Sequence, residues 1–453
     1  MTFESAPSYS ERDNQDLEKQ LPVDAKCAFP GDLCPTIPTL SNRYDGQIKA
    51  PDFLPSLTIP GGFFTSVSAN TPVTLDGGLW TRFVHPEGSP YWYHTVWRIL
   101  VGADLMQPDI KAEVEHWSYR VGALIKDKGI ELPSSSEIVL ELDPASKTCK
   151  YYVACREERT IGWLTECKSD DFYLPVRSEA HLKLQLEHQF WKHAEYFPMH
   201  APPPPRSEEE LLSELAFSIG DLMTSRGSTS SSTPAENLTL YNLLNSQRKD
   251  ASTRTWLVAR IWLQIVLARS LNYYGEYHAR LDRSTSLTGS ESANPLWISL
   301  ISRILFLAQP ERYRQKICDI WVDRIVYQRD WKAFMEQTVM DWQGVATKTL
   351  YIAIINVIFM IVPAKQAFHQ WANFASIVLA ISGLCASHFN IQRYCDTPME
   401  DVTEVADYLS CKESTRIGMY PLAIKFGLPQ ALFLWSIVAF FGSLLCFMIV
   451  TLV

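Results

Sequence analysis

The chain has 453 residues, a formal net charge of −9 and 20% charged residues, below the usual quarter. This acidic balance argues against a nucleic-acid partner, because such partners require a basic patch or stripe. The low charge, together with 14 Trp and 19 Tyr, suits a membrane protein with aromatic-rich soluble modules.

Residues 1–50 are polar and rich in Ser, Pro and Asp, a composition that predicts a disordered N-terminus. They lack the apolar core of a secretory signal peptide. The ten Cys of the chain include no CxxC pair, so a reduced, cytosolic setting is the simplest interpretation.

We predict a first small β module in residues 51–110. Trp80 opens a short strand, and His85–Gly88 places Pro and Gly at the second and fourth positions of a type I turn. Pro90–His94 then returns as a second strand, with neighbouring aromatic side chains on opposite faces.

A second β module, followed by a helix, is predicted in residues 135–200. Its strands are Ile138–Leu142, Lys150–Ala154 and Thr160–Leu164, and Asp143–Ser146 supplies the first turn. The two modules are therefore expected to be small antiparallel sheets.

The spacing from Trp80 to the pair Tyr91-Trp92 resembles that of WW domains, in which a first Trp precedes a paired aromatic at a similar distance. WW domains are three-stranded sheets that bind proline-rich peptides, so the resemblance implies this fold and this class of ligand. Gly102 stands where the second Trp of the family belongs. In this comparison Trp80 is a structural aromatic residue.

Tyr151-Tyr152 followed by Trp163 resembles the second half of another WW copy. The resemblance implies a peptide groove formed by Tyr152 and Trp163, with Tyr151 beside them and with Tyr91 and Trp92 as its counterpart in the first copy. A Tyr next to a Trp forms a rigid apolar cleft that fits a polyproline helix. The alternative is an aromatic-rich antiparallel sheet whose Trp and Tyr side chains form the core.

Residues 201–235 are predicted to be proline- and serine-rich linkers with a helix between them. Pro202–Pro205 forms a polyproline II run, which serves either as a spacer or as a WW ligand in the same or a neighbouring chain. The second use would allow self-association. Ser207–Glu210 starts the intervening helix with negative charge, which the helix dipole favours.

The pattern of Ser178–Phe197 predicts an amphipathic helix with an N-terminal Ser cap. The spacing of its histidines, His181, His188 and His193, does not bring three imidazoles to one point on a helix. We therefore expect no metal site.

Residues 236–345 are predicted to be a helical region. Its apolar helix Thr253–Tyr277 is expected to pack in a bundle with the helices that follow. Glu276, His278 and Asp282 are the best candidates for acid–base chemistry, although a helix-surface ion pair explains their spacing equally well. Because no nucleophile motif, phosphate loop or HExxH accompanies them, we expect no enzymatic activity and no cofactor.

Residues 346–453 are predicted to be a transmembrane region with three spans, Thr349–Ala364, Phe368–Phe389 and Phe426–Val453. At about 1.5 Å per residue the first reaches roughly 24 Å, so Lys348 must snorkel to the headgroups to extend it. The alternative is that these segments are buried helices of a soluble protein.

Lys365 is the only cation between the first two spans, whereas several cations precede the third. The positive-inside rule then places the soluble region in the cytoplasm. Asn356 and Asn373 are expected to form interhelical hydrogen bonds or to lie at the interface. Gly427 and Gly442 would permit close packing or a kink.

Together these features predict an α+β membrane protein with small antiparallel WW-like β sheets, a helical middle region and three C-terminal transmembrane helices. The layout resembles that of fungal membrane proteins with WW-like N-terminal regions, a resemblance that implies no activity. The favoured function is a membrane-anchored adaptor that binds proline-rich segments. The alternative is a structural protein that self-assembles through its sheet and bundle, and a membrane-bound enzyme is the least favoured hypothesis.

Overall fold

The computed structural model describes residues 32–41, 73–143, 147–225, 227–246, 253–287, 295–361, 367–396 and 402–452. Most of the predicted disordered N-terminus therefore lies outside the described residues. The chain divides into two compact units, Met1–Thr224 with Pro234–Ala279 and Ser225–Thr233 with Arg280–Val453. The boundary after Ala279 falls inside the predicted helical region 236–345, so this region does not form a single unit.

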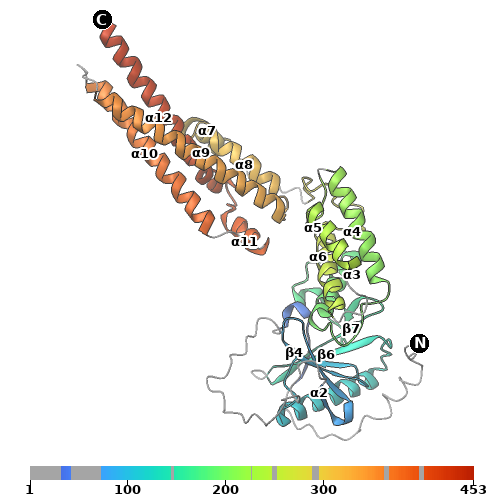
Figure 1. The fold of residues 1–453 in the computed structure, drawn as a ribbon. Coiled ribbons are helices and arrows are strands. Elements are labelled where there is room, and N and C mark those ends of the chain that lie inside the picture. Colours follow the sequence, from blue (N-terminus) through green and yellow to red (C-terminus); the bar gives the residue numbers. More distant parts are fainter. Residues whose placement is uncertain are drawn as a thin grey trace. The chain divides into compact units, whose positions relative to one another are not determined.

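The first unit is built on a mixed eight-stranded sheet with the order β1-β7-β6-β5-β4-β3-β2, and β8 also pairs with β7 (Figure 1). The strands are β1 Leu33–Pro35, β2 Val73–Leu75, β3 Trp80–Val84, β4 Pro90–His94, β5 Ile99–Val101, β6 Ser136–Asp143, β7 Thr148–Cys155 and β8 Thr160–Gly162. The strands predicted from the sequence are confirmed, although β8 ends at Gly162, two residues before the predicted end at Leu164. The turn at His85–Gly88 is closed by the Gly88 N–H, which donates to the carbonyl of His85 at 2.8 Å.

The two predicted β modules are halves of this one sheet and not separate small sheets. β3, β4 and β5 form one antiparallel meander, and β6, β7 and β8 form the other. β5 and β6 join the halves as a parallel pair, with Ile99 opposite Ile138. A parallel pair needs a crossover, and the helix α2 (Pro108–Lys128), which the sequence prediction missed, supplies it.

Helices cover both faces of the sheet. On one face α2 contributes Trp117 to a core that also contains Trp92. On the other face α3 (Glu179–Tyr196) contributes Phe190 to a core that contains Tyr91. The predicted alternation along β4 is thus confirmed, but both sets of side chains are buried because a helix lies over each face.

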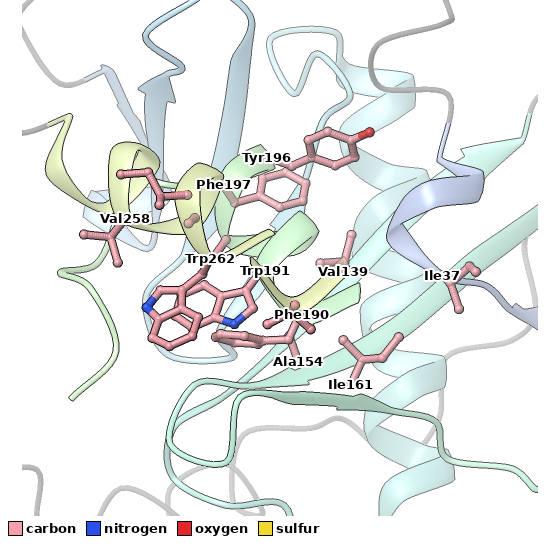
Figure 2. Packing of buried hydrophobic residues seen from close by; sticks show 14 of the residues in the cluster. Ile37, Val139, Ala154, Ile161, Phe190, Trp191, Tyr196, Phe197, Val258 and Trp262 are labelled. Atoms are coloured by element: carbon pink, nitrogen blue, oxygen red, sulfur yellow. The ribbon is translucent and has the colours of Figure 1, made fainter. Parts of the chain in front are cut away.

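α3 is the centre of the helical part of this unit. The hydroxyl of Ser178 caps it by accepting the His181 N–H at 3.0 Å, as predicted. Trp191 of α3 stacks on Trp262 of α6 (Arg254–Leu271), with ring centroids 5.6 Å apart (Figure 2). α6 therefore packs on α3 within the first unit, and the helices that were expected to pack with it belong to the second unit. The remaining helices of the unit are α4 Ser207–Thr224 and α5 Pro234–Ser246.

The second unit is helical. Its helices are α7 Leu296–Leu305, α8 Gln309–Ile320, α9 Gln328–Met360, α10 Ala367–Asp396, α11 Val402–Lys412 and α12 Tyr420–Leu452. Three of them, α9, α10 and α12, are long and apolar enough to cross a membrane, and each overlaps one of the three predicted spans. α9 begins 21 residues before the predicted first span, whose end at Ala364 lies outside the described residues. The described chain is therefore a mixed α+β protein with three candidate membrane spans.

Polar side chains inside the α9–α10–α12 bundle bond to backbone carbonyls of neighbouring helices. The Asn373 amide donates to the carbonyl of Asn356 at 3.0 Å, which confirms a predicted interhelical hydrogen bond. The Ser376 hydroxyl donates to the carbonyl of Ser436 at 2.6 Å. These bonds tie α10 to both α9 and α12.

α8 and α12 approach closely at Gly427. A Cβ added there would lie 2.9 Å from the backbone nitrogen of Pro310, whereas a Cβ at Gly442 would meet nothing within 4 Å. The predicted close packing is confirmed at Gly427.

Replacing Gly427 by Ala is expected to destabilise the second unit by about 1–3 kcal/mol, because backbone atoms cannot yield as a flexible side chain does. Gly442→Ala is the matched control and should be neutral or stabilising by up to about 1 kcal/mol through helix propensity. Thermal unfolding of the detergent-solubilised full chain measures both. Equal melting temperatures for the two variants would contradict the close approach.

Candidate functional site

Four charged or titratable side chains meet inside the first unit, and we name them the Glu137 network: Glu137, Arg156, His193 and His200. Glu137 lies on β6, and Arg156 follows directly after β7. His193 lies on α3, and His200 lies in the segment between α3 and α4. The side chains of Glu137 and the two histidines are at most 5% exposed.

Glu137 accepts from both imidazoles. Its Oε2 lies 2.9 Å from Nε2 of His193, and its Oε1 lies 3.0 Å from Nε2 of His200. The guanidinium of Arg156 lies 3.5 Å from the same Oε1. The carboxylate is thus paired with a cation and hydrogen-bonded twice, as a buried charge requires.

Two tyrosines complete the network. The hydroxyl of Tyr152 lies 3.1 Å from Nδ1 of His193, and the hydroxyl of Tyr91 lies 3.2 Å from Nδ1 of His200. In both histidines Nε2 is thus directed at the carboxylate of Glu137 and Nδ1 at a tyrosine hydroxyl, which suits an ionised Glu137 that accepts Nε2–H hydrogen bonds. Tyr91 and Tyr152 come from the two halves of the sheet, so the network bonds each half to the same carboxylate.

The electrostatics of the network favour an ionised Glu137. Burial alone would raise the pKa of Glu137, but His200, Arg156 and the hydrogen bonds from both imidazoles lower it well below its usual value. Burial lowers the pKa of His193, although its bond to Glu137 acts in the opposite direction. Groups with lowered pKa values stabilise the fold at neutral pH and lose this contribution as the pH falls. The free energy of unfolding of the first unit is therefore expected to fall as the pH is lowered. The fall should begin below about pH 6.5, where histidines of the unfolded chain take up protons.

A carboxylate, an imidazole and a phenol in a row have the donors and acceptors to move a proton. Here both ring nitrogens of each imidazole are occupied by partners in the same chain. The side chains of His193 and His200 are 0% and 1% exposed. The geometry therefore suits a buried cross-link between sheet and helix better than a reaction centre.

The predicted peptide groove is not exposed, which corrects its assignment to Tyr152 and Trp163. Both side chains join the same core under α3, and Tyr152 is 1% exposed. Trp163 is half-buried, stacks on Phe172 at 4.6 Å, and donates its indole N–H to the carbonyl of Thr36 at 2.7 Å. These two aromatics share a face, but α3 and the chain segments around it cover that face.

The other predicted aromatics are also core residues. Tyr151, Trp92 and Trp80 belong to the core on the α2 side of the sheet, and Tyr91 lies on the α3 side in the Glu137 network. A WW-type groove needs one open face, and here α2 and α3 each occupy one. The alternative of an aromatic core describes these side chains better than the groove does.

The proline run contacts the second half of the sheet within the same chain. Arg156 donates to the carbonyl of Pro202, and Arg159 donates to the carbonyl of Pro205 at 2.9 Å. The run is therefore held against the first unit by arginines of the turn between β7 and β8, with Pro204 buried and Pro202 and Pro205 exposed.

Of the predicted acid–base candidates, Glu276 and His278 belong to the first unit and lie close enough to His181 to influence its pKa, whereas Asp282 belongs to the second unit. Glu276 accepts a hydrogen bond from the Ser178 hydroxyl, and the His278 ring contacts Tyr273 at 5.3 Å. Asp282 accepts from the hydroxyl and N–H of Ser284.

Sequence reasoning missed Glu137, Arg156 and His200, and considered His193 only as a metal ligand. One signal was available: strand alternation places Glu137 on the same face as Val139, which is a core position. A charge on a buried face requires a partner. The described residues contain no group of three or more His, Cys, Asp or Glu arranged to hold a metal ion.

Comparison with known proteins gives no match: no protein-family model, no curated protein and no solved structure matches this chain. A functional argument therefore rests on the residues and the geometry described above.

Replacing Glu137 by Gln keeps the size of the side chain but removes the charge opposite Arg156. We expect a loss of about 3–5 kcal/mol in unfolding free energy, because a buried guanidinium is left uncompensated. Denaturant unfolding of the full chain in detergent, followed by tryptophan fluorescence, measures this loss. The control is Glu158→Gln on the exposed turn after β7, expected to change stability by less than about 0.5 kcal/mol. Indistinguishable curves for the two variants would refute the network's stabilising role.

Proposed function

We propose that this chain is a membrane-anchored, non-enzymatic interaction protein whose closed first unit is attached to a bilayer through α9, α10 and α12. The observation that carries the proposal is that these three helices are long and apolar enough to cross a membrane. Their buried Asn and Ser side chains bond to helix carbonyls, as polar groups in hydrocarbon must.

The proposed topology places the start of α9, the end of α10 and the start of α12 on the cytoplasmic side. Trp342 of α9 donates to the carbonyl of Phe426 in α12 at 3.0 Å, and Asn390 of α10 donates to the carbonyl of Lys425. These contacts place Trp342 of α9, Asn390 of α10 and the start of α12 at the same height along the bundle axis. Arg393 lies close to this level on α10, and such cations favour the cytoplasmic side.

The non-enzymatic part of the proposal is supported by the closure of the Glu137 network. General acid–base catalysis requires a group within hydrogen-bond reach of a substrate proton. His193 and His200 instead face Glu137 and the tyrosines, with almost no exposed side-chain surface. The network then serves to hold the two half-sheets and α3 in one rigid unit.

The proline-rich ligand in this proposal is a segment of the same chain. Pro202–Pro205 is bound by the first unit to which it belongs. The support is that Arg156 and Arg159, in the second half of the sheet, donate to carbonyls of this run. Bound in this way, the run fixes the start of α4 against the sheet and is not offered to a neighbouring chain.

A partner surface is proposed on α4 and the end of α6. Glu214 of α4 pairs with Arg269 of α6 at 2.6 Å, and Arg269 lies 4.6 Å from the ring of Tyr274. Phe217, one turn beyond Glu214, is 68% exposed, and Tyr274 is 57% exposed. Exposed aromatics beside an Arg are typical of protein contact surfaces.

Membrane attachment is tested by alkaline carbonate extraction of membranes from cells that express the full chain. The protein should remain in the pellet and be released only by detergent, because spanning helices are held by the hydrophobic effect. A protein recovered in the carbonate supernatant, dispersed without detergent, would overturn the proposed function.

Titration of the full chain in lipid nanodiscs with an Ala-Pro-Pro-Pro-Pro-Arg peptide tests the intramolecular ligand. We expect no saturable binding, because the chain's own run is already in place and Tyr152 is buried. The comparison is Trp163→Ala, which should give the same flat titration. Saturable binding to the unsubstituted chain that disappears in Trp163→Ala would show that Trp163 forms an accessible peptide groove. This result would contradict this account.

A further inference from the structure

α7 presents an apolar stripe that no described part of its own unit covers. Six of its ten residues are exposed large hydrophobic side chains: Leu296, Trp297, Leu300, Ile301, Ile304 and Leu305. Their spacing places them along one broad side of the helix, while Ile298 and Ser302 face inward. Arg303 is the only charged residue of α7.

α7 is hydrogen-bonded to α12, the most apolar of the three candidate spans. The indole N–H of Trp435, in α12, donates to the carbonyl of Leu305 at 2.7 Å. The start of α8 then packs on α12 at Gly427, where only a glycine fits against Pro310. α7 and α8 therefore form a helical hairpin whose connection lies against the first half of α12.

The depth of the Trp435–Leu305 contact along the α9–α12 bundle can be estimated from the helix rise. Trp342 of α9 bonds to the carbonyl of Phe426, so these residues mark one level. From there Lys348 lies about 9 Å along α9 and Trp435 about 14 Å along α12, at roughly 1.5 Å per residue. Lys348 is the last cation of α9, so the end of α7 lies near the boundary between headgroups and hydrocarbon.

We propose that α7 is an interfacial membrane helix, which lies against the cytoplasmic leaflet beside α12 and buries its stripe among lipid acyl chains. This inference rests on the proposed membrane attachment and adds a fourth lipid-contacting element to it. A bilayer is the occupant that the contacts favour, because the stripe continues directly from the apolar surface of a candidate span. Trp297 and Arg303 supply an interfacial aromatic and a cation for headgroups.

α8 provides an internal comparison, because it belongs to the same hairpin but has a polar outer side. Its exposed residues are Arg312, Gln315 and Asp319. Tyr313 and Ile317 face inward and are buried. If the hairpin lies at the membrane surface, α7 faces lipid and the outer side of α8 faces water.

The test uses the full chain in lipid bilayers and a lipid-soluble aryl diazirine, whose photogenerated carbene inserts into C–H bonds exposed to the hydrocarbon. Labelled peptides are mapped by mass spectrometry. We expect α7 to be labelled within about twofold of the exposed α12 residues Val438, Phe441 and Leu445, and α8 to be labelled at least about fivefold less. Leu300→Asp should reduce labelling of α7 and leave that of α12 unchanged.

The outcomes separate this inference from the proposed function. Labelling of α12 with α7 at the level of α8 would overturn the interfacial role of α7 while leaving the membrane attachment intact. Labelling of α7 only at low protein density would assign the stripe to a second copy of the chain and would also overturn it. Absence of labelling in α9, α10 and α12 would overturn the proposed function itself.

Discussion

Burial of both faces of a single sheet is the constraint on which the rest of the first unit depends. With α2 over one face and α3 over the other, adjacent residues such as Tyr91 and Trp92 point in opposite directions and are both buried. Aromatic side chains fill such a core well, but their hydroxyl and indole groups need hydrogen-bond partners inside it. The tyrosine–histidine bonds of the Glu137 network meet this requirement on the α3 side.

The same network explains how two similar half-sheets become one unit. The parallel pairing of β5 with β6 joins their backbones, and Glu137 joins their side chains through His193 and His200. Arg156 pairs with the carboxylate of Glu137 and donates to the carbonyl of Pro202, so the Glu137 network also holds the proline run. A buried ion pair adds little net stability over an apolar core, but it specifies one arrangement of the elements that meet there.

Local features of this fold could be predicted from the sequence, and non-local ones could not. Alternation and turn residues located β3, β4, β6 and β7, and a Ser cap located α3, because these signals lie within a few residues. The parallel pairing and the partners of Glu137 depend on contacts that are remote in sequence: His193 and His200 are 56 and 63 residues away. The WW resemblance rested on spacing alone, and spacing does not reveal that α2 and α3 cover the faces. The three candidate spans were predictable because a continuous apolar run is itself a local signal.

Hydrogen exchange of the full chain, read by mass spectrometry, tests the closed sheet most directly. Amides of β6 and β7 are paired on both sides and lie between two helical layers, so they should be among the slowest of the first unit to exchange. The short strand β2, at the end of the strand order, should exchange fast. Exchange of β6 and β7 as fast as that of β2 would mean that the halves open as separate small sheets, which would contradict this account.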